Sequence, residues 1–350
     1  MDKINQGGTD MIEINGIKCH ETLRRTKAPL LAFREDCDYA TWRAALKEKF
    51  IELTGLNVIA ENACDPHLTV ESDEQKDGYR QIRFVFESEV DELVPCYLLI
   101  PDTGKEKYPL AITLQGHSSG FHNSVGIIKY ERDKDYHPRG QFGIQAVRQG
   151  YIALCIEQRA MGERRVKTEN ERKRGCEFQT HNAMMLGRTT VGERVWDVSR
   201  AIDLMPTLCP LCDMDKIVIT GNSGGGTASF YAACYDERIK ASIPSCAFCS
   251  YDTSIMAMHH CSCNFIPGAR RWFDMGELAA LIAPRPLSVI AGVKDDGFLI
   301  EGVRSAFATA KAVYTAAGCP ENAALIETPR GHWWCEDIVW KTVAEAIENI

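Results

Sequence analysis

One short run of residues has the composition of a site for nucleophilic catalysis. Residues 221–225 have the pattern G-x-S-x-G, between an apolar stretch at 216–220 and a run of small residues. In a sharp strand-to-helix turn of this kind, the serine hydroxyl stands above the sheet and the next N–H points to where an oxyanion forms. We therefore predict that Ser223 is a nucleophile and that Gly224 is an oxyanion donor. The alternative is a glycine-rich turn in which Ser223 only caps a helix.

A serine hydroxyl is a weak nucleophile unless a base takes its proton and an acid orients that base. In a strand–turn–helix site, the acid and then a histidine are expected later in the chain, each after a strand. Among the nine histidines, His332 satisfies this order, follows a late apolar stretch and has a glycine before it. The carboxylates Asp295 and Asp296 both follow the apolar stretch at 287–291, and Asp252 is a reserve candidate.

A second oxyanion donor is expected from the loop after an early strand. Gln115, Gly116 and His117 follow the apolar stretch at 111–114 and occupy that place. Gly116 allows the backbone to approach a substrate closely. We predict that the backbone N–H of His117 is the second donor and that its imidazole takes no part in catalysis.

Two aromatic residues are candidates for a substrate pocket, namely Phe121 and Trp333. Trp333 follows the base directly, and it either forms the wall of an acyl or sugar pocket or covers the adjacent helix. For Trp334 we favour the covering role. The charged stretch at 164–174 either forms the rim of the cleft or is a solvated loop, and we favour the loop.

The elements that must position these residues alternate along the chain. Short apolar strands at 109–114, 151–156, 216–220, 240–243, 287–291 and 323–327 are separated by stretches of helical period. This order predicts an α/β fold with a mostly parallel central sheet and helices on both faces. Before it we expect a helix over 39–53 and an antiparallel hairpin of 82–87 with 94–100. We divide the chain into an N-terminal extension, irregular and then helical, at 1–80, and a catalytic domain at 81–350. Excursions from the sheet are expected near 163–190 and 251–275.

Composition and charge exclude several classes of protein. The 350 residues have a net charge of −8, without a dense basic block, so we expect no nucleic-acid partner. No apolar run is long enough for a membrane span, and no secretory signal is visible, so we expect a cytoplasmic protein without a membrane partner. The fifteen cysteines are then expected to be reduced thiols. Two C-x-x-C pairs lack compact metal-site spacing, and we predict no metal and no cofactor.

These motifs together resemble the α/β-hydrolase superfamily from about residue 101 to the C-terminus, and within it the dienelactone-hydrolase-like and acetyl xylan esterase-like branch. The segments that carry the resemblance are 115–117, 157–163, 221–225, 283–286, 292–295 and 331–332. The resemblance marks Asp295 as the acid. Dienelactone hydrolases use cysteine where this chain has Ser223, so the esterase branch is nearer.

The resemblance implies a serine carboxylic ester hydrolase that acts through an acyl-enzyme, without a cofactor. We expect it to remove short acyl groups, such as acetyl, from a carbohydrate or another small ester. The alternative is an amide or peptide hydrolase of the same fold. A non-catalytic binding protein would normally lack one member of the triad, and all three are present. The sequence leaves the oligomeric state open.

Overall fold

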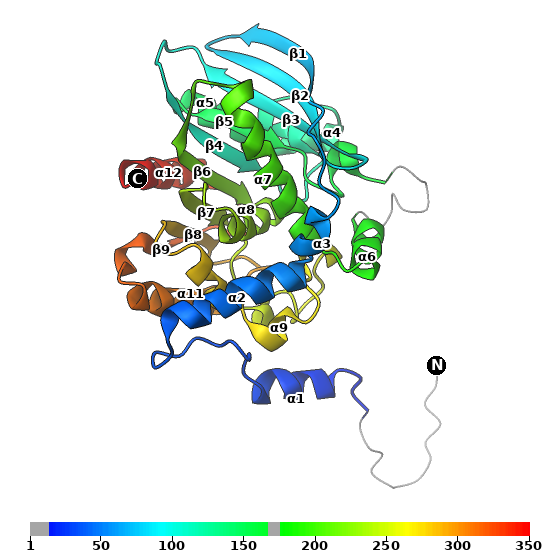
Figure 1. Ribbon diagram of the computed structural model, residues 1–350, viewed down its shortest axis with the longest axis vertical. Coiled ribbons are helices and arrows are strands. Elements are labelled where there is room, and N and C mark those ends of the chain that lie inside the picture. Colours follow the sequence, from blue (N-terminus) through cyan, green and yellow to red (C-terminus); the bar gives the residue numbers. More distant parts are fainter. Residues whose placement is uncertain (1–13, 167–175) are drawn as a thin grey trace.

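One mixed sheet runs through the molecule (Figure 1). In the computed structural model, which describes residues 14–166 and 176–350, its nine strands have the spatial order β1-β2-β3-β5-β4-β6-β7-β8-β9. The strands from β5 to β9 in this order are parallel, whereas β1, β2 and β3 are antiparallel to their neighbours. The strands are β1 (Thr69–Lys76), β2 (Tyr79–Glu89), β3 (Glu92–Pro101), β4 (Tyr108–Leu114), β5 (Ile152–Ile156), β6 (Cys212–Asn222), β7 (Ala241–Ser245), β8 (Leu287–Gly292) and β9 (Ala323–Thr328).

Helices cover both faces of this sheet (Figure 1). The helices are α1 (Lys18–Thr26), α2 (Tyr39–Thr54), α3 (Leu56–Ala60), α4 (Glu131–Tyr136), α5 (Phe142–Arg148), α6 (Glu177–Met185), α7 (Thr190–Leu208), α8 (Gly224–Tyr235), α9 (Ala269–Trp272), α10 (Met275–Leu278), α11 (Ile300–Ala316) and α12 (Glu336–Glu348). Side chains of α2, α3, α7, α8 and α11 pack into one apolar core, and those of α5 and α12 into the other. Within β4, Leu110 and Ile112 enter the first core and Ala111 enters the second, because alternate side chains point to opposite faces of a strand. The predicted α/β class is confirmed.

Three elements among the first eighty residues were not expected from the sequence, namely α1, α3 and β1, and α3 is a short helix that follows α2 after Gly55. Helix α1 lies in the stretch that was expected to be irregular, and β1 adds a third strand to the predicted hairpin. Helix α1 has no buried residue, and β1 is an edge strand whose side chains are exposed or half-buried. Neither α1 nor β1 buries an apolar face in a core: α1 is a short, mostly polar helix, and β1 has no apolar alternation, so the sequence carries little signal for either.

The described residues of the two predicted excursions lie outside the sheet. Residues 251–275 form short helical turns and α9, and α6 lies in the other excursion. We expected Arg164 to lie in a solvated loop, but the structure contradicts this. Its side chain is only 5% exposed, and its guanidinium lies 2.7 Å from Asp197 Oδ2 and also bonds Glu92. Residues 167–174 of that stretch lie outside the described residues.

Among the helices that the structure describes, none combines the length and the apolar composition that would allow it to cross a membrane.

Candidate active site

Ser223 stands at a strained turn between β6 and α8. Its backbone has φ 57° and ψ −126°, which is unusual for a residue with a side chain. The turn closes tightly, since a Cβ on Gly221 would lie 2.6 Å from the carbonyl carbon of Gly225. A Cβ on Gly225 would lie 2.0 Å from the carbonyl oxygen of Leu114 on the neighbouring strand. The G-x-S-x-G pattern is therefore required by the packing of the turn itself.

The Ser223 hydroxyl faces a cleft instead of capping the helix. In the first turn of α8, which the structure describes in full, no backbone N–H donates to the Ser223 side chain. This contradicts the alternative in which the serine is only a helix cap. The cleft has a volume of about 370 Å³ and is lined by Gly116, His117, Ser118, Ser119, Arg132, Asp133, Tyr136, Arg139, Asn222, Ser223 and His332.

Asp295 holds the imidazole of His332. Asp295 Oδ2 lies 2.8 Å from His332 Nδ1, and Asp295 is 4% exposed. Its other oxygen, Oδ1, accepts the backbone N–H groups of Gly297 at 2.9 Å and Phe298 at 3.1 Å. Burial opposes the charge of this carboxylate, but His332 and the two N–H groups outweigh that effect and lower the pKa of Asp295 below its ordinary value. Asp295 is therefore an anion that holds the imidazole through Nδ1. It makes no contact with Nε2, the other ring nitrogen.

The turns after β8 and β9 are bonded to each other, which sets this geometry. Lys294 N–H donates to the Arg330 carbonyl at 2.9 Å, next to the Asp295–His332 pair. A Cβ on Gly292 would lie only 2.1 Å from the Gly331 carbonyl oxygen, so the close approach of the two turns needs glycine. Sequence reasoning placed the two turns at one edge of the sheet, but their direct bonding has no signal in the sequence.

Phe298 is a neighbour of the site that the sequence analysis missed. Its ring stacks on the His332 imidazole with centroids 5.9 Å apart and planes 12° from parallel. The ring is buried and also meets His260 edge-on. Phe298 therefore restricts the tilt of the imidazole. Its position three residues after Asp295 was the only available signal.

The other candidate acids lie elsewhere. Asp296 is exposed to solvent. Asp252 forms an ion pair with Arg270 at 2.8 Å, which engages both of its carboxylate oxygens. The structure thus brings Asp295, and neither of the alternatives, to His332.

The loop after β4 passes directly over the serine turn. A Cβ on Gly116 would lie 2.9 Å from Ser223 Cβ and 3.5 Å from Gly224 N. Gln115 is buried and anchors this loop, because its amide donates to Ser124 Oγ and to the Gly140 carbonyl, both at 2.7 Å. The backbone at 116–117 is therefore held next to the N-terminus of α8, where an oxyanion would be stabilised.

The imidazole of His117 faces a group of cysteines. Its Nε2 lies 3.2 Å from Cys263 Sγ and 3.8 Å from Cys176 Sγ. Desolvation, with a further contribution from the charge of Arg194, lowers the pKa of His117 to about 4. The sequence analysis expected fifteen reduced thiols, but Cys176 and Cys261 are joined as a disulfide in the structure. These residues are 85 positions apart, so only the fold brings them together.

The aromatic candidates separate into core and rim. Phe121 was predicted to line the pocket, but it is fully buried and packs on Tyr97 with ring centroids 4.9 Å apart, away from the cleft lining. Trp334 is buried against Phe142, as favoured. Trp333 is 43% exposed, and the guanidinium of Arg139 lies 3.6 Å from its ring centroid. Since Arg139 lines the cleft, Trp333 lies at its rim.

A buried carboxylate supports the loops beside the cleft. Glu157 is 1% exposed and accepts the backbone N–H groups of Phe121 at 3.2 Å and Glu163 at 3.1 Å. Burial raises the pKa of Glu157 to about 7, because these two donors compensate only part of its lost hydration. The segment 157–163 carried part of the family resemblance, and its role in bracing the loops was not foreseen.

Comparison with known proteins points to one family. A model of the group described as "Abhydrolase family" matches residues 6–331. The "Putative hydrolase YtaP" of Bacillus subtilis (strain 168) is 26% identical over 245 residues, which are 69% of this chain and 79% of that protein. The "4-O-methyl-glucuronoyl methylesterase" of Phanerochaete carnosa (strain HHB-10118-sp) is 24% identical over 212 residues, 53% of this chain and 51% of that protein. A crystal structure of a "putative acetyl xylan esterase" from Bacteroides fragilis NCTC 9343 has a TM-score of 0.77 at 18% identity, covering 95% of each chain.

Proposed function

This chain belongs to the abhydrolase family and has the α/β-hydrolase fold, and we propose that it is a serine esterase that hydrolyses short acyl esters of carbohydrates. One observation carries the proposal. Ser223, at a strained strand-to-helix turn, shares a cleft with His332, whose Nδ1 is held at 2.8 Å by the buried carboxylate of Asp295.

The proposed reaction follows from the roles that this geometry allows. Ser223 Oγ attacks the ester carbonyl carbon while His332 Nε2 takes the hydroxyl proton. Asp295 keeps the second proton of the imidazole on Nδ1 and stabilises the imidazolium. The N–H groups of Gly224 and His117 bind the oxyanion. His332 then returns the proton to the leaving alcohol, which departs and leaves Ser223 acylated. A water molecule, deprotonated by His332, releases the acid and restores the serine.

The cleft supports a small polar substrate. Its volume of about 370 Å³ is at the lower end of the range for ligand pockets. In the described part of the chain, no aliphatic side chain lines it, and Arg132 and Arg139 are both present. Hydroxyl groups of a sugar suit these donors and acceptors better than a long alkyl chain does. The names of the relatives refer to acetyl xylan and glucuronoyl esters, which are esters of carbohydrates.

Apart from the Cys176–Cys261 pair, the thirteen other cysteines are free, which favours a reducing compartment, and we propose the cytoplasm. Cys37, Cys64 and Cys335 are free and only partly buried, and exposed thiols of this kind are typical of proteins that work under reducing conditions.

A panel of substrates tests the proposal. Nitrophenyl esters from acetate to decanoate, acetylated xylo-oligosaccharides, a methyl ester of glucuronic acid and a peptide amide are compared by kcat/KM. We expect acetate to exceed hexanoate and longer chains, acetylated sugars to be turned over, and the amide to react far more slowly. A rate that rises steadily to decanoate would contradict the short-acyl proposal. Comparable rates on the amide would favour the amide hydrolase.

A further inference from the structure

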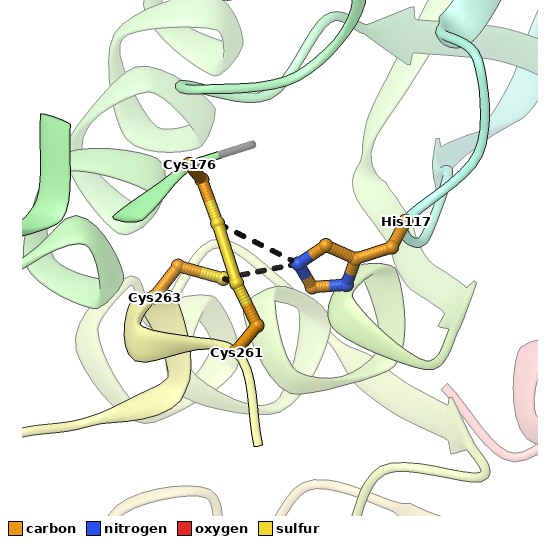
Figure 2. Close-up of side chains that lie close together, drawn as sticks. All are labelled: His117, Cys176, Cys261 and Cys263. Atoms are coloured by element: carbon orange, nitrogen blue, oxygen red, sulfur yellow. Dashed lines mark hydrogen bonds between the residues drawn. A yellow bond between two sulfur atoms is a disulfide. The ribbon is translucent and has the colours of Figure 1, made fainter. Parts of the chain in front are cut away.

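Four side chains with metal-binding atoms converge beside the cleft (Figure 2). They are the imidazole of His117 and the thiols of Cys176, Cys261 and Cys263, and their ligand atoms all lie within 4.8 Å of one another. They come from three separate places: the loop after β4, the residue before α6, and a short helical turn at 261–264. Cys261 and Cys263 have a local C-x-C spacing, but the other two ligands, His117 and Cys176, are distant from them in the sequence. The group is therefore a product of the tertiary fold.

A simple disulfide accounts for only part of this arrangement. The Cα atoms of Cys176 and Cys261 are 7.5 Å apart, beyond the 7 Å or so at which two cysteines can be bridged without backbone movement. A disulfide between them would also leave two further metal-binding groups, the His117 imidazole and the Cys263 thiol, without a role at the same place. Cys263 Sγ lies 3.3 Å from Cys261 Sγ and 3.2 Å from His117 Nε2, and it is fully buried. The feature to be explained is the meeting of three sulfur atoms and one nitrogen.

We propose that these four residues form a structural zinc site of the Cys₃His type. With bonds of about 2.3 Å to sulfur and about 2.0 Å to nitrogen, a tetrahedral zinc ion places its ligand atoms about 3.5 to 3.8 Å from one another. His117 Nε2 lies 3.2 Å from Cys263 Sγ and 3.8 Å from Cys176 Sγ, which is close to these ligand-to-ligand distances. A metal between Cys176 and Cys261 requires their sulfur atoms to part, which the wide Cα separation accommodates. This proposal departs from the sequence expectation of no metal, which weighed the two C-x-x-C pairs and noted Cys261 and Cys263 but could not join them to His117 and Cys176.

The surroundings suit the charge of such a site. The site forms from the reduced protein: a cellular thiol reductant supplies two electrons and two protons, which cleave the Cys176–Cys261 bond and leave two thiols. Binding of Zn²⁺ then releases three thiol protons and leaves three thiolates and one neutral imidazole, a net charge of −1. The buried guanidinium of Arg194 donates to Cys263 Sγ at 3.4 Å and supplies a compensating positive charge. Such hydrogen bonds to ligating sulfur orient the ligand and stabilise its thiolate form.

The site would fix the loop that carries the proposed second oxyanion donor. A ligand bond at His117 Nε2 joins the 116–117 backbone to α6 and to the turn at 261–264. This consequence, unlike the site itself, rests on the proposed function. Removal of the metal is then expected to lower kcat more than it raises KM.

The decisive measurement is the metal content of the full-length protein. It is produced in zinc-supplemented medium, purified with a reducing agent and without chelator, and analysed by inductively coupled plasma mass spectrometry. We expect about one zinc per chain in the wild type and in the control Cys319→Ala, which removes a buried cysteine outside the cluster. Cys263→Ala and Cys261→Ala are expected to lose the zinc. Absence of zinc from the wild type, or iron or copper in its place, would overturn the proposal.

Two measurements on the wild type keep the test independent of whether the variants fold. After denaturation in chelator without reductant, all fifteen cysteines should react as free thiols, whereas a persistent Cys176–Cys261 disulfide would leave thirteen and contradict the site. Cobalt substituted for zinc should show the visible absorption of tetrahedral thiolate coordination. These readouts use no substrate, so an inactive protein with one zinc would refute only the esterase proposal. An active esterase without metal would refute only the site.

Discussion

Replacement of Asp295 by asparagine isolates the orienting role of the carboxylate. The two oxygens of Asp295 have different partners: Oδ1 accepts the N–H groups of Gly297 and Phe298, and Oδ2 accepts from His332 Nδ1. In Asp295→Asn, the amide oxygen stays with the two backbone donors and the NH₂ group faces His332. That NH₂ can only donate, so Nδ1 must lose its proton and the imidazole becomes the Nε2–H tautomer. In this tautomer Nε2 cannot accept the proton of Ser223.

The expected loss can be estimated from these hydrogen bonds. To recover the right tautomer, the amide must flip and set its NH₂ against the two backbone N–H groups. Two buried unsatisfied donors cost about 1–3 kcal/mol each. Loss of the charged partner of the imidazolium adds about 1.5–3 kcal/mol. Together these contributions come to about 3.5–9 kcal/mol, and since 1.36 kcal/mol is tenfold in rate, we expect kcat to fall by between about 400-fold and several million-fold. The same substitution in a serine protease lowers turnover about 10⁴-fold.

The matched control is Asp296→Asn, which removes the same charge from an exposed neighbour. We expect its kcat to change less than about twofold, because surface substitutions away from a site have small effects. Both variants are compared on one acetyl ester after circular dichroism has shown that they are folded. If Asp295→Asn keeps a tenth of the wild-type kcat, or if Asp296→Asn is the inactive variant, the assignment of the acid is wrong.

Two further substitutions probe the supports of the cleft. Glu157→Gln should become more stable relative to the wild type as pH rises from 5 to 8, because a carboxyl with its pKa raised from 4.5 to about 7 loses its contribution to stability on ionising. The free energy of unfolding of Glu157→Gln minus that of the wild type, measured by denaturant unfolding, should rise by up to about 3 kcal/mol between pH 5 and pH 8. If this difference is the same at both pH values, the burial argument is wrong. Trp333→Ala should raise KM for an acetylated sugar roughly fivefold with little change in kcat, since a rim contact binds substrate and transition state alike. Steady-state kinetics would contradict this if kcat alone fell.

The serine turn and the base could be predicted because their signals are local. The G-x-S-x-G pattern, the apolar strand before it and the small-residue helix after it are contiguous, and parallel strands end at one edge of the sheet. Asp295 was harder, because Asp296 has the same residue type and nearly the same position. The backbone N–H groups of Gly297 and Phe298, which bind Asp295 Oδ1, distinguish the two only in the folded chain.

The features that were missed depend on contacts between distant segments or lack an apolar period. His117 and Cys176 meet Cys263 through the fold, so no spacing rule could join them. Phe121 follows the oxyanion loop, and a lone aromatic residue in a loop has the same sequence signal whether it faces a cleft or the core. In the folded chain, Phe121 packs on Tyr97 and therefore lies in the core and not at the cleft. Strand β1 lies at the sheet edge and buries nothing, so its residues show no alternation.

Covalent labelling with a fluorophosphonate tests most directly whether Ser223 is the nucleophile. Attack by Ser223 Oγ forms a bond to phosphorus and expels fluoride, while His332 takes the hydroxyl proton. We predict one adduct per chain, mapped by peptide mass spectrometry to Ser223, with esterase activity lost in proportion to labelling. The Ser223→Ala variant should remain unlabelled and inactive. Full activity in a completely labelled protein, or inactivation with the adduct on another residue, would contradict the account.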